Sequence, residues 1–435
     1  MSKSELKLAV IGTGYLGATH AACMAELGFE VIGVDNDPSK IAKLSKGELP
    51  FYEPELPELI AKHVKSGKLR FTTDYSEISD CDVHFICVGT PQSEKGIAAD
   101  LTFVNSAFAE VAKVAKSGSL LVGKSTVPVG TAQRLSTQLP ANLELAWNPE
   151  FLREGFAVQD TLKPNRLVVG VTSDRAEEVL KAVYRKNLED GTPWIRADLP
   201  TAELVKVAAN SFLATKISFI NAMAEICEVA GGDVTVLAEA IGHDPRIGNR
   251  FLQAGIGFGG GCLPKDIRGF MARAEELGAS QSLEFLREID SINARARQRV
   301  IEVVRSELGM DLKSFKIAIL GAAFKPDSDD VRDSPALDIA AQIHDAGADV
   351  IVHDPKAIEP AKKRFPSLNF TENLEECLKG ADLVLHLTEW KIYREMDPNE
   401  IKKIVKTPRI IDGRNMLNRD KWRAAGWDFK GLGRA

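Results

Sequence analysis

A chain of 435 residues is too long for one ordinary hydrophobic core, so its length suggests two or three domains. Apolar residues make up 44% and charged residues 27% of the sequence, which is typical of a globular protein and excludes a disordered or collagen-like chain. The net charge of -6 argues against nucleic acid or an anionic membrane as a partner.

The apolar runs are interrupted by Gly, Asp or Lys before they reach a membrane-spanning length, and the N-terminus lacks a signal-peptide cleavage pattern. We therefore expect a cytoplasmic protein. Its six cysteines are scattered without a CxxC pair, as is typical of reduced thiols. The sequence favours neither a disulfide framework nor a metal site.

The N-terminus has the pattern of a βαβ unit. An apolar strand at residues 8–11 leads into Gly12, Gly14 and Gly17, a helix follows, and a second strand at 31–34 ends at Asp35. The acid lies about 20 residues after the glycines, which is the context of a dinucleotide fingerprint. Asp35 should accept the ribose hydroxyls and repel a 2′-phosphate, so NAD is favoured over NADP. The alternative is a glycine-rich turn that only packs a helix on a sheet.

Further apolar strands are predicted at residues 83–88, 120–126 and 143–147. Polar segments follow them, including Thr90 and the stretch that begins at Asn148. Ligands of open parallel sheets bind at such strand ends.

The pattern recurs in the C-terminal part, with apolar strands at residues 316–321, 348–354, 382–387 and from 409. Here the glycine fingerprint has become Gly-Ala-Ala-Phe-Lys-Pro from Gly321, so this loop should not hold a dinucleotide in the same way. Lys325 and Arg332 fit a diphosphate instead, with a solvated charged loop as the alternative.

A long helix is predicted between the two copies, from Thr201 to about Ala230 and preceded by a break at Pro200. Lys206 and Asn210 lie one turn apart on it. The predicted fold is α/β, with two Rossmann-like doubly wound parallel-sheet domains joined by this central helix. A second helix is expected from about Leu283 to Leu308.

Residues 257–266 place Cys262 after three glycines and before Pro264, which suits the first position of a helix. A helix N-terminus and a neighbouring lysine favour the thiolate, which is the nucleophilic form. Taken alone, the segment favours a buried structural cysteine in a tight turn over a reactive one.

The sequence thus combines an NAD domain, a second nucleotide-sized domain and a candidate reactive thiol. This combination suggests an oxidation in which the substrate carbon becomes bonded to the cysteine sulfur. An aldehyde captured as a thiohemiacetal can lose a second hydride to give a thioester, which water hydrolyses to an acid. The chemistry needs a base, an oxyanion stabiliser and an ordered water, and the available residues are Asp266, Lys206, Asn210, Glu150 and Thr126.

Five motifs, at residues 255–266, 201–212, 124–131, 148–155 and 321–335, resemble the UDP-glucose 6-dehydrogenase family over essentially the whole chain. The resemblance implies oxidation of UDP-glucose to UDP-glucuronate with two NAD+ and one water. It also implies an NAD-binding domain at residues 1–200, a helical connector and dimerisation region with the cysteine loop at 201–313, and a UDP-sugar-binding domain at 314–435.

The resemblance assigns roles residue by residue. Cys262 is the implied nucleophile, Asp266 activates water, Lys206 and Asn210 stabilise oxyanions, and Glu150 and Thr126 assist through the water network. The implied NAD-binding residues are Gly12, Gly14, Tyr15, Leu16, Gly17, Asp35, Lys40, Thr90, Thr126, Glu154, Lys265 and Arg332. The implied substrate-binding residues are Glu150, Phe151, Leu152, Arg153, Glu154, Lys206, Asn210, Arg246, Phe251, Leu252, Gln253, Ala254, Gly255, Gly259 and Lys325.

Arg246 resembles an arginine that reaches the sugar of a partner subunit, so the resemblance implies a homodimer. The segment 246–255 favours UDP-glucose over GDP-mannose. Gly261 departs from the family, which commonly has serine there, but it preserves the bend.

Three alternatives stay open. The substrate could be GDP-mannose or a UDP-N-acetylhexosamine. The chain could be a catalytically silent NAD-binding scaffold, against which the intact set of Cys262, Lys206, Asn210 and Asp266 argues. A simple two-electron hydroxyacid dehydrogenase would need neither the cysteine nor a second nucleotide domain.

Overall fold

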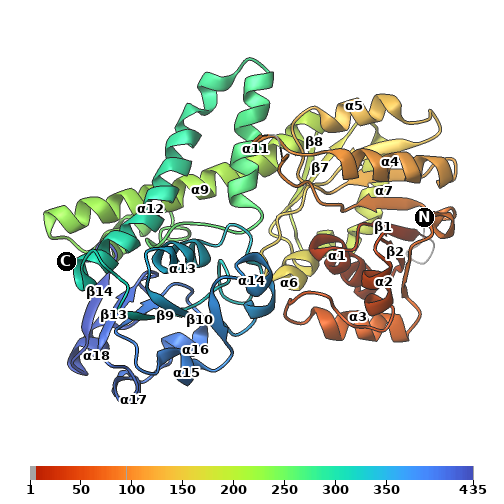
Figure 1. The fold of residues 1–435 in the computed structure, drawn as a ribbon. Helices are drawn as coiled ribbons and strands as arrows, with labels where there is room; N and C mark the ends of the chain where they lie inside the picture. The colour runs from red at the N-terminus through yellow and green to blue at the C-terminus, as the bar shows by residue number, and fades with distance from the viewer. Residues whose placement is uncertain (1–5, 95, 435) are drawn as a thin grey trace. The chain divides into compact units, whose positions relative to one another are not determined.

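The structure, a computed structural model, describes residues 6–94 and 96–434 (Figure 1). Two compact units divide the chain: residues 1–209 with 268–278 form the first, and residues 210–267 with 279–435 form the second. Each unit is built around one sheet.

The first unit has an eight-stranded sheet in the order β3-β2-β1-β4-β5-β6-β7-β8 within the described residues. All neighbouring strands are parallel except β6 and β7. The strands are β1 Lys7–Ile11, β2 Glu30–Val34, β3 Leu69–Thr72, β4 Val83–Ile86, β5 Leu120–Gly123, β6 Glu144–Trp147, β7 Leu167–Val171 and β8 Trp194–Ala197. Strands β3, β7 and β8 were not anticipated from the sequence.

Helices cover both faces of this sheet, because successive side chains of a buried strand point to opposite sides. Leu8 and Val10 of β1 pack in one apolar cluster with α1, α3, α6 and α7. Ala9 and Ile11 pack in a second cluster with α4, α5 and the start of α9, Leu199–Ala230 (Figure 1). The helices are α1 Tyr15–Glu26, α2 Pro38–Leu44, α3 Leu56–Lys65, α4 Thr102–Val114, α5 Thr131–Gln138, α6 Ala157–Leu162, α7 Asp174–Val183 and α8 Arg185–Glu189. The unit is doubly wound, as predicted.

The second unit contains a six-stranded parallel sheet in the order β11-β10-β9-β12-β13-β14 within the described residues. This is the strand order of a Rossmann fold. The strands are β9 Lys316–Leu320, β10 Asp349–His353, β11 Asn369–Thr371, β12 Leu383–His386, β13 Arg409–Asp412 and β14 Asp428–Gly431. Its helices are α13 Pro335–Asp345, α14 Ile358–Arg364, α15 Leu374–Leu378, α16 Lys391–Arg394, α17 Pro398–Lys402 and α18 Arg419–Ala424. The predicted fold class is confirmed.

The long predicted helix is α9, Leu199–Ala230, with 32 residues. At about 1.5 Å per residue it is about 48 Å long. Pro200 was expected to precede this helix, but it lies in the first turn, where the backbone N–H that proline lacks has no helical partner. The remaining helices are α10 Val234–Gly242, α11 Leu263–Glu276 and α12 Glu284–Leu308.

We expect Gly17→Ala to destabilise the first unit. An added Cβ at this position would lie 1.7 Å from the backbone oxygen of Gly12, so α1 would have to move off the loop. Overpacking of this kind costs about 1–3 kcal/mol. Thermal unfolding should show a lower Tm, and the Kd for NAD should rise.

Gly269→Ala is the matched control, because its Cβ would meet open space inside α11 and alanine is the better helix former. Equal melting temperatures for both variants would contradict the close packing at Gly17.

Candidate functional site

The loop between β1 and α1 has the geometry of a dinucleotide cradle. Gly12 has a φ of 85°, a conformation that favours glycine, and Gly17 packs directly on its backbone oxygen. A Cβ at Gly14 would meet nothing within 4 Å, so the backbone there is open to a close ligand. The N-terminus of α1 follows at Tyr15 and suits a pyrophosphate. These residues fit NAD.

Asp35, directly after β2, is held by the same loop. Its carboxylate accepts hydrogen bonds from the backbone N of Thr13 at 2.8 Å and from Lys40 Nζ at 2.7 Å. Burial opposes ionisation, but these bonds outweigh it and keep the pKa of Asp35 below its usual value. Asp35 therefore carries a negative charge at neutral pH, and its contact with the ribose of NAD stays a prediction.

Glu53 is hydrogen-bonded to two segments of the predicted NAD site. Its carboxylate, almost completely buried, accepts hydrogen bonds from the backbone N–H groups of Gly155 and Ala157, each at 2.7 Å, and from the Tyr15 hydroxyl. Burial and this carboxylate both raise the pKa of Tyr15. Glu53 thus joins the α1 loop to the segment that contains Glu154.

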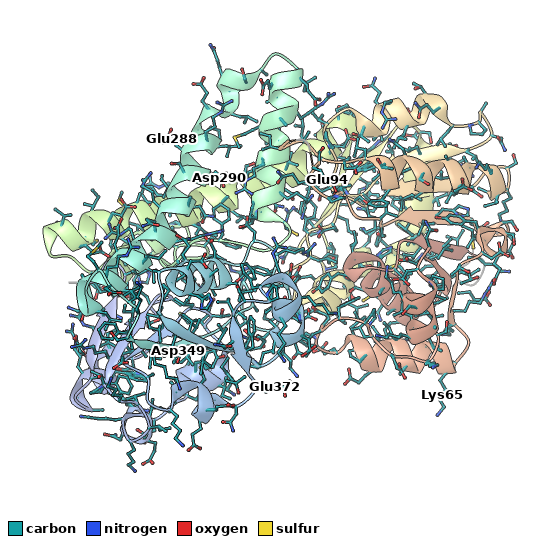
Figure 2. All side chains as sticks on the ribbon, in the orientation of Figure 1. Lys65, Glu94, Glu288, Asp290, Asp349 and Glu372 are labelled. Carbon is teal, nitrogen blue, oxygen red and sulfur yellow. The ribbon has the colours of Figure 1, made fainter. Side chains whose placement is uncertain are left out.

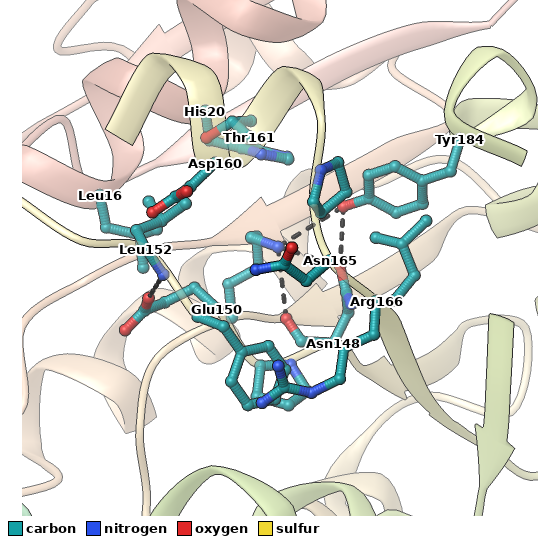
Figure 3. A pocket seen from close by; sticks show the side chains of 15 residues that line it. Leu16, His20, Asn148, Glu150, Leu152, Asp160, Thr161, Asn165, Arg166 and Tyr184 are labelled. Atoms are coloured by element: carbon teal, nitrogen blue, oxygen red, sulfur yellow. Dashed lines mark hydrogen bonds between the residues drawn. The ribbon is translucent and has the colours of Figure 1, made fainter. Parts of the chain in front are cut away.

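Glu150 follows β6 and forms a buried ion pair with Lys206 of α9, with 2.9 Å between Oε1 and Nζ. Its other oxygen accepts the backbone N–H of Leu152 at 2.6 Å (Figure 3). The ring of the intervening Phe151 lies 5.7 Å from Lys206 Nζ and 3.8 Å from the Arg166 guanidinium. The first unit therefore brings together two of the predicted catalytic residues.

Thr126 lies in a loop that α9 and α11 hold from two sides. Thr90 Oγ1 donates to the backbone oxygen of Thr126 at 2.8 Å, and Arg273 Nε donates to that of Val129 at 2.8 Å. The buried carboxylate of Glu203 accepts the N–H groups of Gly130 and Ala132 at the start of α5, at 2.7 and 2.6 Å. Burial raises the pKa of Glu203 to about 7 despite these two bonds.

Cys262 immediately precedes α11 and is exposed. The helix begins at Leu263, so Pro264 is its second residue and not its first, as we had expected. Of the three preceding glycines, only Gly260 has a positive φ, 85°.

At positions 259 and 261 glycine is favoured because neighbouring atoms leave little space for a side chain, and not because the backbone has a positive φ. An added Cβ would lie 2.2 Å from the backbone oxygen of Asp333 at Gly259, and 2.2 Å from the Arg332 guanidinium at Gly261. The second collision involves a flexible, largely exposed side chain, so a residue larger than glycine is excluded less strictly at 261 than at 259.

Asp266 is buried one turn into α11 and has two polar neighbours in the second unit. Asn210 Nδ2 donates to its Oδ2 at 2.7 Å, and Lys265 Nζ lies 2.8 Å from its Oδ1. The structure thus brings Asn210, Lys265 and Asp266 together next to the segment that begins at Cys262. Lys206 lies on α9 one turn before Asn210.

The predicted sugar-binding loop at residues 251–255 has a fixed backbone. Phe251 has a φ of 64°, which is uncommon for a residue with a side chain. Gly255 donates its N–H to Asn221 Oδ1 at 2.8 Å, and Asn415 Nδ2 donates to the Ala254 oxygen at 3.2 Å. Leu252 and Ala254 are buried, and Gln253 is exposed.

The second sheet uses its acid differently from the first. Asp354, after β10, is buried, and its Oδ2 accepts the N–H groups of Ala322 and Ala323 at 2.7 and 3.0 Å and the Trp390 indole N–H at 3.1 Å. The loop amides that would face a pyrophosphate are therefore consumed within the fold. The expectation that the loop from Gly321 does not hold a dinucleotide stays a prediction.

In the described part of the chain, no group of three or more His, Cys, Asp or Glu side chains could hold a metal ion. None of the helices found there is both long enough and apolar enough to span a membrane.

Comparison with known proteins decides the family. Profiles of the UDP-glucose/GDP-mannose dehydrogenase family match the chain in order: the NAD binding domain at residues 6–188, the central domain at 200–295 and the UDP binding domain at 318–419. The chain belongs to the UDP-glucose/GDP-mannose dehydrogenase family. The NAD cofactor expected from the sequence is confirmed by the first of these domains.

Individual relatives match over nearly their whole length. A UDP-glucose 6-dehydrogenase of Rhizobium meliloti is 38% identical, with 99% of this chain and 100% of the relative covered, and one of Bacillus subtilis is 39% identical, with 98% and 93% covered. Among solved structures, a UDP-glucose dehydrogenase from Pyrobaculum islandicum has a TM-score of 0.90 at 34% identity, covering 100% of this chain and 99% of that one. A UDP-D-ManNAc dehydrogenase from Pyrococcus horikoshii has a TM-score of 0.85 at 27% identity and covers 99% of each chain.

Within this dehydrogenase fold, several predicted binding residues are engaged with neighbours in the sequence. Arg153 pairs with Asp160 at 2.7 Å, Arg246 pairs with Asp244 and is exposed, and Arg332 Nη2 lies 2.7 Å from Asp330 Oδ2. Lys325 lies 5.4 Å from the ring of the adjacent Phe324. Their contacts with ligands stay predictions.

Glu53, Glu203 and Lys124 are parts of this dehydrogenase fold that the sequence did not single out. Each is buried and bonded mainly to the backbone or to neutral groups. An isolated acid or lysine outside a glycine or cysteine motif gives no local signal of burial, so only the tertiary structure identifies them.

We expect Cys262 to be the one cysteine that reacts rapidly with iodoacetamide in the native protein. The other five are buried, and burial raises the pKa of Cys23, Cys81, Cys87 and Cys377 to about 12, so they hold almost no thiolate at neutral pH. Mass spectrometry after a short exposure should find one added group, located at Cys262. The Cys262→Ser variant should not acquire this group, whereas Cys227→Ser should acquire it as wild type does. Rapid labelling of Cys262→Ser would contradict this assignment.

Proposed function

We propose that this chain oxidises UDP-glucose to UDP-glucuronate with two NAD+ and one water. The observation that carries the proposal is the exposed Cys262 at the start of a helix whose buried Asp266 is hydrogen-bonded to Asn210. The full-length similarity to UDP-glucose 6-dehydrogenases supports UDP-glucose as the sugar.

The chemistry is a four-electron oxidation at one carbon. When bound, NAD+ supplies the hydride acceptor. The C6 alcohol loses a hydride and its hydroxyl proton to give an aldehyde. The Cys262 thiolate then adds to the carbonyl carbon, and the C=O π electrons move to oxygen, where Lys206 and Asn210 stabilise the charge.

The resulting thiohemiacetal loses its hydroxyl proton and a second hydride to become a thioester. Asp266 orients a water that attacks this thioester, the C–S bond breaks, and Cys262 leaves as a thiolate. For a sugar written RCH2OH, the sum is RCH2OH + 2 NAD+ + H2O → RCOO− + 2 NADH + 3 H+. Glu150 and Thr126 assist through the water network.

The proposal predicts two NADH for each UDP-glucose consumed, measured at 340 nm with limiting sugar. Cys262→Ser should retain the wild-type Kd for NAD but lose steady-state turnover, because no thioester can form. A ratio of one with release of an aldehyde would refute the thioester route. NADH formation with GDP-mannose or a UDP-N-acetylhexosamine, but not with UDP-glucose, would refute the choice of sugar.

We also propose a homodimer formed through α9. Phe212, Phe219 and Ile226 are spaced by seven residues, so they lie along one side of the helix. Their exposed fractions are 67%, 47% and 61%, which is unusual for large apolar side chains that line up on one helix. A helix from a second copy, related by a two-fold axis, presents the same stripe and covers it.

Light scattering should therefore give twice the mass of the chain, and Phe219→Glu should reduce it to the monomer mass because a buried charge opposes association. Met310→Glu, at an exposed position outside α9, is the control and should remain dimeric. A wild-type protein that is monomeric at micromolar concentration would overturn the proposal.

A further inference from the structure

A buried lysine outside the catalytic set lies within the first unit. Lys124 directly follows β5, and its Nζ donates hydrogen bonds to Asn148 Oδ1 at 2.9 Å and to the Asn148 backbone oxygen at 3.3 Å. A buried ammonium group whose hydrogen-bond partners are neutral is costly, and costly charges of this kind gather at functional sites.

Asn148 is fixed from three directions. Besides Lys124, the Tyr184 hydroxyl donates to Asn148 Oδ1 at 2.7 Å (Figure 3). Asn148 Nδ2 donates to the Val168 oxygen at 2.8 Å. These bonds leave the Asn148 side chain one orientation. Asn148 is also the first residue of the turn after β6 that leads to Glu150, so the direction in which Glu150 leaves the sheet depends on it.

A small pocket is lined by both Lys124 and Glu150. It has a volume of about 70 Å³, and His20, Asn148 and Tyr184 also line it (Figure 3). This volume has room for a few water molecules. Nε2 of the buried His20 has no hydrogen-bond partner among the described residues, so a water in the pocket would also satisfy this atom.

The electrostatics point the same way. Burial lowers the pKa of Lys124 to about 8, while the nearby Glu150 favours its charged form. The pocket is also lined by Tyr184, which is neutral because burial raises its pKa, and by His20, which is neutral because burial and Lys124 lower its pKa. Two further charged residues line it: Asp160, which pairs with Arg153 at 2.7 Å, and Arg166, whose guanidinium lies 3.8 Å from the Phe151 ring. Glu150 is the acid among them that favours the charged form of Lys124.

We propose that Lys124 is a positioning residue for Glu150, acting through Asn148 and the water-sized pocket behind it. The inference rests on the proposed function, because Glu150 is assigned there to the water network. Lys124 touches neither sugar nor nicotinamide in this account. It holds the turn so that Glu150 keeps its bond to Leu152 and its ion pair with Lys206.

A double-mutant cycle tests the inference with Lys124→Met and Glu150→Gln, measuring kcat for UDP-glucose-dependent NADH formation. Lys124→Met should lower kcat by about 10- to 100-fold, the effect of losing a charge-assisted hydrogen bond that orients an acting group. In the Glu150→Gln background, the same change should cost about twofold or less, because residues that act as a unit are not additive. Equal losses in both backgrounds would overturn the inference, and so would a fully active Glu150→Gln.

A second variant covers the case in which Lys124→Met does not fold. Tyr184→Phe removes one hydroxyl from the same Asn148 oxygen, so it should lower kcat by a few fold at an unchanged Kd for NAD, again only when Glu150 is present. Lys65→Met is the matched lysine control, since Lys65 is exposed at the end of α3 (Figure 2) and should keep wild-type kcat. A Tyr184→Phe variant with lower Tm but wild-type kcat would show a purely structural role and would overturn the inference.

The same assays distinguish a failure of the proposed function from a failure of the role proposed for Lys124. If wild-type protein forms no NADH with UDP-glucose, the substrate assignment fails. If wild type is active but the cycle is additive, only the role of Lys124 fails.

Discussion

The uninterrupted backbone hydrogen-bond ladder of α9 is the constraint on which the arrangement of predicted catalytic groups depends. Glu203, Lys206 and Asn210 lie within two turns of one helix, so their spacing cannot change without breaking it. Glu203 binds the loop that contains Thr126, Lys206 pairs with Glu150, and Asn210 binds Asp266. Glu150, Asp266 and the loop with Thr126 are thus each bonded to a residue of α9.

In each sheet an acid follows the second strand: Asp35 follows β2 and Asp354 follows β10. The same strand pattern thus places one acid beside a loop open to a ligand and the other inside the fold. Asp35 is partly exposed and accepts one amide of its loop, that of Thr13, whereas Asp354 is buried and accepts two amides of its loop, those of Ala322 and Ala323. Ala323 stands in the second loop where the first has Gly14. The repeated strand pattern therefore preserves the fold, while a few loop atoms decide which ligand can approach.

Sequence patterns predicted the parts of the structure that have strong local signals. The glycines around Gly14, the apolar strands and the helical periodicity before Asn210 are encoded by neighbours along the chain, so fold class and cofactor followed from them. The strands that were not predicted, β3, β7, β8, β11 and β14, and the roles of Glu53, Glu203 and Lys124 depend on partners far away in sequence. Burial of a charge is a property of tertiary packing, which no local pattern of residue types determines.

The cysteine loop has a consequence for how the protein is made. The Cβ positions of Gly257, Gly259 and Gly260 are limited by atoms of Asn293, Asp333 and Phe324, all of which follow the loop in the chain. A ribosome delivers the chain from its N-terminus, and N-terminal domains generally fold first. The nascent chain can thus complete its dinucleotide loop early, while Cys262 acquires its shaped surroundings only after residues beyond Asp333 have emerged. Cys262 therefore gains its packed surroundings only when the second sheet is being synthesised.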